Sequence, residues 1–427
     1  MEIELHYGKS TITLTLPDRN VGKIIRPWHS DTGSNNESHV RFALKNREST
    51  SFRQAVSGKR VCVLTEDATR DMPIGDILPV LAPLLSGAGS VGFIISTGTH
   101  SADTTGNRRI TETIKRMSGS DGFNCDVHVH DCEKCDFSEA GKTRSGTSIQ
   151  YNRLVDDAEV FLVLSDVKCH YFAGYSNPVK NFCPGICSYQ TVEKNHSLAL
   201  DENSRFGYHP WHPDLERRRN PVANDQLEGM KIIVRGRPVF SLVTISTSGD
   251  IQWAGFGKVE EITEQAIQVV DSNNIRDLPA SDRLVVSPGG YPNDVSLYIA
   301  QRALEMTQAA VTDGGEILFL TACPDGPGEP QTMENFYNRL TAPLEEIFKS
   351  TESGYRLYSH KPYRLAKLVK RMSAIYMLSE MPDRLVSDAH MIPVHDPAKV
   401  IDGWIARDPG ARINFVDGAN KTAVKSR

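Results

Sequence analysis

Hydrophobic and polar residues alternate with a period of two over the first thirty residues. The runs IELHYG and TITLTLP show this alternation most clearly. A period of two places successive side chains on opposite faces of a strand, so one face can be buried while the other meets water. The opening segment is therefore predicted to form a β-hairpin.

Short apolar runs then alternate with longer helical stretches. The expected strands are RVCVLTED (60–67), SVGFIISTGTH (90–100), DVHVHD (126–131) and AEVFLVLSD (158–166). Between the first three strands lie two expected helices, IGDILPVLAPLLSGAG (74–89) and HSADTTGNRRITETIKRM (100–117). Strand, loop, helix and strand repeated at this spacing predict an α/β fold with a doubly wound, mainly parallel sheet.

A second β-α-β pattern begins after about residue 274. Its expected strands lie in DRLVVSPGGYPND (282–294), GEILFLTACPDGPG (315–328) and SAIYMLSEMP (373–382), with a helix over 295–314. The segment 399–420 reads as a helix and a strand. We therefore predict an N-terminal catalytic and cofactor-anchoring domain over 1–274 and a second α/β domain over 275–399 that closes the active-site cleft. Residues 400–427 are expected to return to the first domain.

Composition narrows the class of protein. The chain has 427 residues, which is typical of two or three domains, and a net charge of −5, which argues against a nucleic-acid partner. No apolar run approaches the ~20 residues that a membrane span needs. The N-terminus MEIELHYGKS is acidic where a signal peptide would be basic, so we expect a cytoplasmic protein.

The eight cysteines are widely spread and read as reduced thiols. In CDVHVHDCEKC (125–135), Cys132 and Cys135 have the spacing of zinc ligands, but no second close pair follows. We interpret this segment as a strand that runs into a loop.

Polar motifs follow three of the apolar strands directly. These motifs are EDATRD (66–71), TGTH (97–100) and KCHYFAGYSNPVK (168–180). Ligands of doubly wound sheets bind at the carboxyl ends of the strands, so the motifs are expected to share one site. Arg70 in the first motif either binds an anion at a helix N-terminus or is a surface residue beside an N-cap.

Two histidines follow neighbouring strands of the predicted sheet. A single histidine is more often structural, but the strand-end positions of His100 and His170 favour an acid and a base that flank one substrate. Lys180 is a candidate phosphate cation, Schiff-base former or covalent tether, and His196 is a candidate metal ligand. HPWHP (209–213) is interpreted as a proline-bounded surface loop, with a segment that lines the cleft as the alternative.

Together these motifs resemble the nickel-dependent lactate racemase family of 2-hydroxyacid racemases and epimerases. The resemblance runs from LHYG and LPDRNV through DATR, TGTH, HYFAGYS and NH to NPV, SPGGYPND and CPDGPG. It implies an isomerase that inverts C2 of a 2-hydroxy acid by reversible hydride transfer to a tethered nickel-pincer nucleotide, pyridinium-3-thioamide-5-thiocarboxylic acid mononucleotide. The expected partners are the small-molecule substrate and the cofactor-biosynthesis enzymes of the host, with no nucleic acid and no membrane.

The resemblance also implies a role for each matching residue. His100 and His170 would be the acid and the base, Lys180 the covalent tether, and His196 the nickel ligand. The residues expected to contact the cofactor are Asp67, Thr69, Arg70, Thr99, Gly174 and Tyr175. The residues expected to bind the substrate are Arg70, Tyr298, Arg302 and Tyr363.

Several positions depart from the family pattern. Ser101, Ile299 and Tyr363 stand where lactate-specific members typically have arginine, glutamine and tryptophan, and Arg302 replaces a lysine. These changes leave two alternatives for the substrate: lactate, or an acid that is larger or more polar than lactate, such as a sugar acid or malate. Two other functions stay open: a non-catalytic protein that binds nickel or a hydroxy acid, and a nicotinamide oxidoreductase, although no G-x-G-x-x-G motif follows the first strand.

Overall fold

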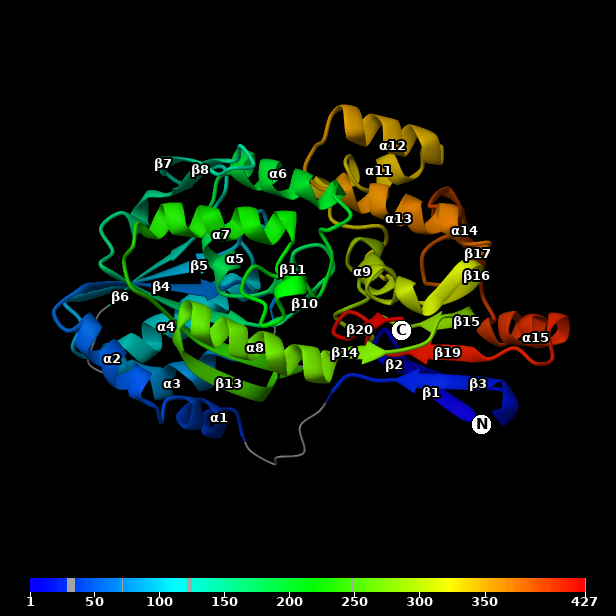
Figure 1. Cartoon of the computed structure of the whole chain (residues 1–427), viewed down its shortest axis with the longest axis horizontal. Coiled ribbons are helices and arrows are strands. Elements are labelled where there is room, and N and C mark those ends of the chain that lie inside the picture. The colour runs from blue at the N-terminus through cyan, green and yellow to red at the C-terminus, as the bar shows by residue number, and fades with distance from the viewer. Residues whose placement is uncertain (29–34, 71, 121–124, 248, 427) are drawn as a thin grey trace. The chain divides into compact units, whose positions relative to one another are not determined.

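The computed structural model describes residues 1–28, 35–70, 72–120, 125–247 and 249–426. The chain divides into two compact units (Figure 1). Unit 1 joins Met1–Trp28 to Ser272–Arg427, and unit 2 is His29–Asp271. Both units are α/β with mainly parallel sheets, which confirms the predicted fold class.

Unit 2 contains a six-stranded sheet in the order β13-β12-β9-β4-β5-β6. All neighbours pair in parallel except β12 and β13, which are antiparallel. The strands are β4 (Arg60–Glu66), β5 (Ser90–Ser96), β6 (Cys125–Val129), β9 (Val160–Asp166), β12 (Val239–Thr247) and β13 (Asp250–Lys258).

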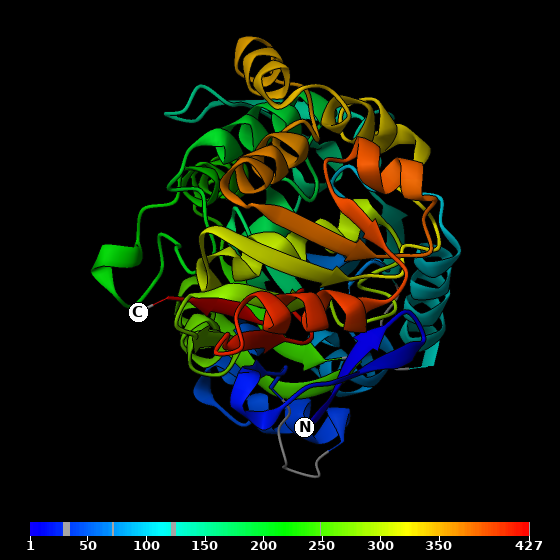
Figure 2. The same cartoon turned by 90° about the vertical axis from the view of Figure 1, so that its right-hand side faces the viewer.

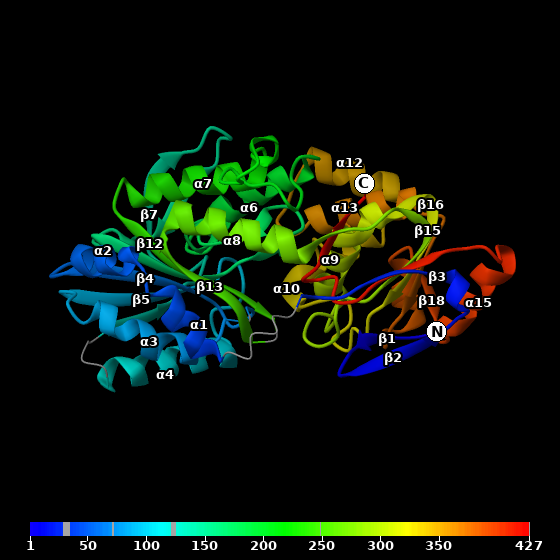
Figure 3. The same cartoon turned by 60° about the horizontal axis from the view of Figure 1, so that its bottom comes forward.

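Helices cover both faces of this sheet. Figure 3 shows α1 (Asn36–Ala43), α3 (Ile74–Leu85) and α4 (Thr105–Ser120) on one side, and α6 (Tyr189–Ser197), α7 (Pro221–Val234) and α8 (Val259–Asn274) on the other. The remaining helices are α2 (Arg47–Val56) and the short α5 (Val179–Phe182). The central strand β9 is buried along its whole length, as its apolar sequence predicts for a strand covered on both faces. Two small hairpins, β7 (Phe137–Lys142) with β8 (Ser148–Asn152) and β10 (Lys168–His170) with β11 (Gly174–Ser176), complete the unit.

Unit 1 contains a six-stranded parallel sheet in the order β18-β17-β16-β15-β19-β3. Its strands are β3 (Val21–Ile25), β15 (Ser281–Val286), β16 (Val311–Leu320), β17 (Ala374–Leu378), β18 (Ile392–Val394) and β19 (Ile413–Val416). A smaller pair joins β14 (Ile275–Asp277) to β20 (Ala423–Lys425).

Two hydrophobic cores lie on opposite faces of the unit 1 sheet. One includes α9 (Leu297–Thr307) and α13 (His360–Arg371). The other is closed by α15 (Pro397–Arg407) and by the hairpin of β1 (Glu2–Tyr7) and β2 (Ser10–Thr15). Figure 2 shows α15, in red, across one face of the unit 1 sheet. The remaining helices of this unit are α10 (Pro330–Met333), α11 (Tyr337–Leu340), α12 (Leu344–Ser353) and α14 (Asp383–Asp388).

The division into units differs from the sequence prediction at both ends of the chain. The predicted hairpin is present, but residues 1–28 belong with the second half of the chain, and residues 400–427 stay in that unit instead of returning to the first domain. The reason is pairing: β3 extends the second sheet by bonding to β19, and β1–β2 then covers that sheet. The helix expected over 295–314 is also shorter, because Val311 already begins β16.

Candidate active site

The three strand-end motifs of unit 2 meet at one edge of its sheet. Strand β4 lies between β9 and β5, and all three run in parallel. Glu66, at the end of β4, is in register with Ser96 at the end of β5. The segments that follow these strands therefore leave the sheet side by side, which is where parallel sheets bind their ligands.

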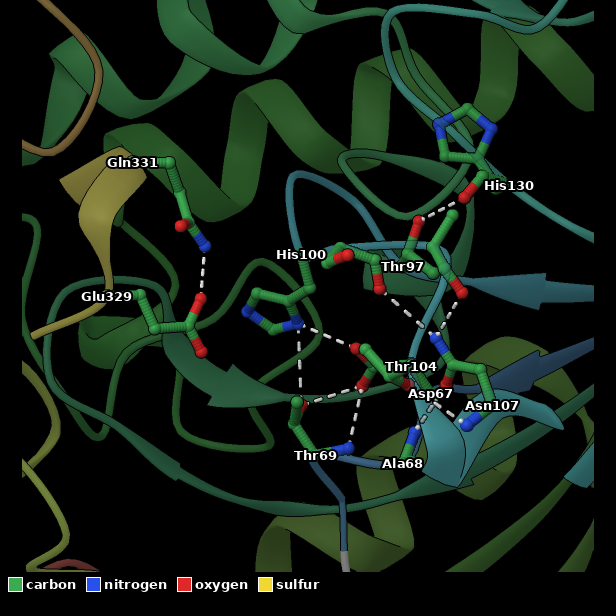
Figure 4. A network of polar contacts seen from close by, with 12 residues as sticks. Asp67, Ala68, Thr69, Thr97, His100, Thr104, Asn107, His130, Glu329 and Gln331 are labelled. Atoms are coloured by element: carbon green, nitrogen blue, oxygen red, sulfur yellow. Dashed lines mark hydrogen bonds and ion pairs between the residues drawn. The ribbon is translucent and has the colours of Figure 1, made fainter. Parts of the chain in front are cut away.

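Asp67 and His100 form a hydrogen-bonded pair at this edge. Nδ1 of His100 lies 2.7 Å from Oδ2 of Asp67, and the Thr69 hydroxyl donates to Oδ1 of the same carboxylate at 2.7 Å. Figure 4 shows the three side chains pointing toward one another. Because a carboxylate can only accept, Nδ1 of His100 carries the proton of this bond, and Nε2 of the neutral ring keeps its lone pair.

The environment of Asp67 keeps its carboxyl group ionised. Asp67 is 4% exposed, and this burial alone would raise its pKa. The charge and hydrogen bond of His100, the charge of Arg70 and the Thr69 hydroxyl outweigh burial, so the pKa of Asp67 lies below its ordinary value. A fixed carboxylate behind an imidazole orients the ring and stabilises its protonated form.

The backbone of the DATR turn is held by Asn107 of α4. The Asn107 side chain accepts a hydrogen bond from the Ala68 amide at 3.0 Å and donates to the carbonyl oxygens of Ser101 and Ala102 (Figure 4). A Cβ atom at Gly106 would lie 2.3 Å from Cβ of Ala68, so this approach of helix to turn requires glycine. The turn and the His100 loop are thereby fixed to each other.

His170 lies on the hairpin of β10 and β11, opposite Gly174. The Ala173 amide donates to Nδ1 of His170 at 3.2 Å, so the neutral ring carries its proton on Nε2. Gly174 has φ +77°, and a Cβ there would lie 1.8 Å from the Tyr208 carbonyl oxygen. Glycine is required at this position because the hairpin packs directly on the backbone of the loop that follows α6.

His196 and His170 contact the same phenyl ring. The ring centroid of Phe172 is 4.6 Å from that of His170 and 5.3 Å from that of His196. His196 lies in the last turn of α6, whose neighbouring residue Asn195 is buried and donates to Asp225 of α7 at 2.9 Å. The structure thus brings the predicted acid/base residue and the predicted metal ligand into contact with one aromatic side chain.

Lys180 is connected to the His100 loop through the backbone. The Gly185 amide donates to the Lys180 carbonyl at 2.8 Å, and the Gly185 carbonyl accepts from the Gly98 amide at 3.0 Å. A Cβ at Gly185 would lie 2.6 Å from the Lys180 carbonyl oxygen, so the close turn requires glycine. Lys180 and His100 therefore come from segments that are bonded to each other, and Thr99 lies in the same turn.

Arg70 and Tyr175 differ in burial and in the contacts of their side chains. Arg70 is half-buried, and its positive charge acts on the carboxylates of Glu66 and Asp67. The Tyr175 ring is completely buried, and its hydroxyl contacts Asp271 and Arg217. Burial raises the pKa of Tyr175 well above its ordinary value, and the structure gives its hydroxyl a structural role beside its predicted contact with the cofactor.

The HPWHP segment is not a surface loop, contrary to the sequence interpretation. His209, Trp211 and His212 are all buried. Nε2 of His212 lies 3.0 Å from Asp271, the same carboxylate that holds the Tyr175 hydroxyl. The segment packs on the hairpin that carries His170, and the repeated aromatic residues were the signal in the sequence that pointed to burial.

The predicted substrate residues of unit 1 lie on two packed helices. Tyr298 and Arg302 are on α9, and Lys361 of α13 donates from Nζ to the Tyr298 carbonyl at 2.9 Å while lying 3.8 Å from the centroid of its ring. Burial, together with the charge of Arg302, lowers the pKa of Lys361 well below its ordinary value. Tyr363 points elsewhere: its hydroxyl donates to Glu352 at 2.8 Å. Lys361 gave no signal in the sequence.

Side chains of the protein alone do not build a metal centre in the part of the chain that the structure describes, where no group of three or more His, Cys, Asp or Glu side chains is placed to hold an ion. The helices within these ranges also include none that is long and apolar enough to cross a membrane.

Comparison with known proteins identifies the family. The lactate racemase N-terminal domain matches residues 7–207, and the lactate racemase C-terminal domain matches residues 277–404. A lactate racemase of Thermoanaerobacterium thermosaccharolyticum is 29% identical over 348 residues, which cover 78% of this chain and 76% of that protein. A lactate racemase of Lactiplantibacillus plantarum is 25% identical over 353 residues, covering 79% and 78%.

Solved structures agree in fold. The lactate racemase apoprotein from T. thermosaccharolyticum superposes with a TM-score of 0.84 at 24% identity, covering 100% of both chains. A protein from Thermotoga maritima gives a TM-score of 0.66 at 14% identity, covering 92% of this chain and 98% of the other. With two family domains matched in order along the chain, this protein belongs to the lactate racemase family and is an isomerase.

Proposed function

We propose that this isomerase inverts C2 of a 2-hydroxy acid, with His100 and His170 as the acid/base residues. The observation that carries the proposal is the meeting of three strand-end segments at one sheet edge, with Asp67 bonded to His100 at 2.7 Å. The two curated relatives are both lactate racemases, which supports the reaction type.

The residues present fit a covalently held nickel-pincer nucleotide. His196 offers an imidazole, a ligand that suits nickel, and Lys180 offers an amine for the tether. Arg70 offers a guanidinium for a phosphate or carboxylate. When bound, such a cofactor would supply the acceptor for the hydrogen and electron pair that leave C2. We therefore propose Lys180 and His196 as its anchors, with Thr99, Gly174 and Tyr175 lining the same region.

The protein's own part in the reaction is to orient the substrate and to move a proton. We propose that Nε2 of His100 accepts the proton of the substrate hydroxyl, and that the Asp67 carboxylate stabilises the imidazolium that results. His170 carries its proton on Nε2 and can donate to the substrate oxygen. Arg70 would pair with the substrate carboxylate.

The substrate roles of Tyr298, Arg302 and Tyr363 rest on the resemblance and remain predictions. The same holds for a substrate larger or more polar than lactate. Single variants of Tyr298 and Arg302 are expected to raise KM for the substrate. Tyr363→Phe tests the substrate role of this position, because in the structure the Tyr363 hydroxyl donates a hydrogen bond to Glu352.

The test is a panel of chiral 2-hydroxy acids in deuterium oxide, with protein co-expressed with the host's cofactor-biosynthesis enzymes. We expect inversion of at least one acid with its C2 hydrogen retained. His100→Ala and His170→Ala should each lose inversion by a factor of about 10²–10⁴. His128→Ala, which removes an exposed histidine on β6, is the matched control. Solvent deuterium at C2, or no inversion of any acid, would contradict the proposal.

A further inference from the structure

Glu66, the last residue of β4, brings a buried carboxyl group to the same sheet edge. The side chain is 7% exposed, and Oε1 accepts a hydrogen bond from the Ser165 hydroxyl of β9 at 3.0 Å. Oε2 is also buried but has no hydrogen-bond partner among the residues that the structure describes. A buried carboxyl oxygen without a partner is unfavourable, so its presence at a ligand-binding edge points to a group that the ligand supplies.

Glu66 lies among two cations and one other carboxylate. Arg70 and Lys168 attract its carboxylate and the backbone of Asp166 hydrogen-bonds to it, while the Asp166 carboxylate repels it. Nζ of Lys168 already lies 3.7 Å from Asp166. One anionic group of a substrate can therefore pair with Arg70, but a second would meet Glu66 and Asp166.

Glu66 is also next to both segments that carry the proposed acid and base. It precedes Asp67, which holds His100, and its partner Ser165 lies five residues before His170 on the chain that leaves β9. Because β4 and β9 are neighbouring strands, a substrate whose C2 lies between the two imidazoles can extend its remaining carbons along the sheet edge at which Glu66 lies. In either protonation state a carboxyl oxygen accepts a hydrogen bond from a hydroxyl group.

We propose that Glu66 is a specificity-determining residue whose second carboxyl oxygen binds a hydroxyl group of the substrate beyond C2. The site then selects polyhydroxylated monocarboxylic acids and disfavours dicarboxylic acids. This inference rests on the proposed function and decides between its two substrate classes: sugar acids are favoured over malate. Discrimination of this kind is strong because an analogue without the hydroxyl leaves a buried polar group unpaired.

Three probes that differ only at C3 test the proposal: glycerate has a hydroxyl there, lactate a hydrogen and malate a carboxylate. We expect the loaded wild-type enzyme to invert glycerate with a kcat/KM at least tenfold above that for lactate, and malate with the lowest value. Glu66→Met removes the acceptor and should lower the glycerate-to-lactate ratio by about 10- to 100-fold. Glu66→Gln keeps an acceptor but removes the charge, so at a pH of about 8.5, where the wild-type side chain is ionised, it should raise the malate-to-lactate ratio.

Glu159→Gln, at the opposite end of β9, should change neither ratio. A glycerate-to-lactate ratio that Glu66→Met changes by less than threefold would overturn the inference but leave the proposed function intact. A wild-type kcat/KM for malate that equals the value for glycerate would also overturn the inference and leave the proposed function intact. Failure of the wild type to invert any 2-hydroxy acid would overturn both. If Glu66→Met does not fold, the malate-to-lactate ratio of Glu66→Gln is the deciding measurement. A ratio unchanged from that of the wild type would overturn the role proposed for Glu66.

Discussion

Replacing Glu66 by glutamine should stabilise the protein at neutral and alkaline pH. Burial raises the pKa of Glu66 to about 7 from the ordinary 4.5, even though Arg70 opposes this rise. Each pKa unit corresponds to about 1.4 kcal/mol, so ionising this side chain in the folded state costs about 3 kcal/mol. The amide of glutamine fills nearly the same space but does not titrate.

The sign of this change in stability follows from the difference in proton binding between the folded and the unfolded protein. Between pH 4.5 and about 7 the folded protein holds the Glu66 proton more tightly than the unfolded chain does. Wild-type stability therefore falls as the pH rises through this range, and the full cost is present above pH 7. Glu66→Gln lacks this loss. The free energy of unfolding of the variant minus that of the wild type should therefore increase by about 3 kcal/mol between pH 4.5 and pH 8.

Urea unfolding at a series of pH values measures this difference, because groups that titrate in both proteins cancel. Glu159→Gln is the control, since Glu159 is a partly exposed glutamate whose pKa is lowered, not raised, by hydrogen bonds to Arg60 and Lys59, so any change of its difference from wild type with pH should have the opposite sign. A difference between Glu66→Gln and wild type that stays constant from pH 4.5 to pH 8 would refute the reasoning. It would mean that Arg70 and Lys168 fully compensate the burial of the carboxylate.

Three further predictions follow from other contacts. Asp67→Asn should lower kcat of the loaded enzyme by a factor of about 10² or more, because His100 loses the carboxylate that holds it; a loss below threefold would contradict this role. Asp225→Ala leaves buried donors of Thr147 and Asn195 unpaired and should lower the free energy of unfolding by about 3 kcal/mol, which denaturant titration checks. Lys361→Met should change the pH dependence of stability, because burial lowers the pKa of Lys361 in the folded protein. The free energy of unfolding of the wild type, relative to that of the variant, should rise as the pH increases toward 10.5. A difference between the two proteins that does not change with pH would contradict this prediction.

The sequence predicted the fold class and the strand-end motifs because both depend on local patterns. Apolar runs of strand length separated by amphipathic helices indicate a parallel sheet, and the topology rule then places the segments after β4, β5 and β9 at one edge. The structure agrees, and it adds the bond between Asp67 and His100, which a spacing of 33 residues does not reveal.

Other features depend on contacts between distant segments. The alternation of residues 2–15 predicts a hairpin but not which sheet it covers, so the first 28 residues were assigned to the wrong unit. Proline-rich HPWHP looks like an exposed loop until Asp271 is seen to bind His212. Lys361 becomes notable only because α13 packs its amine on the ring of Tyr298.

The proposed function depends most directly on Lys180 as the covalent anchor of the cofactor. The intact mass of protein co-expressed with the cofactor-biosynthesis enzymes tests this claim without any assumption about the substrate. We predict a mass increase that disappears in Lys180→Ala and persists in Lys194→Ala, which removes an exposed lysine on α6. An unmodified wild-type mass, or an adduct that survives in Lys180→Ala, would contradict the account.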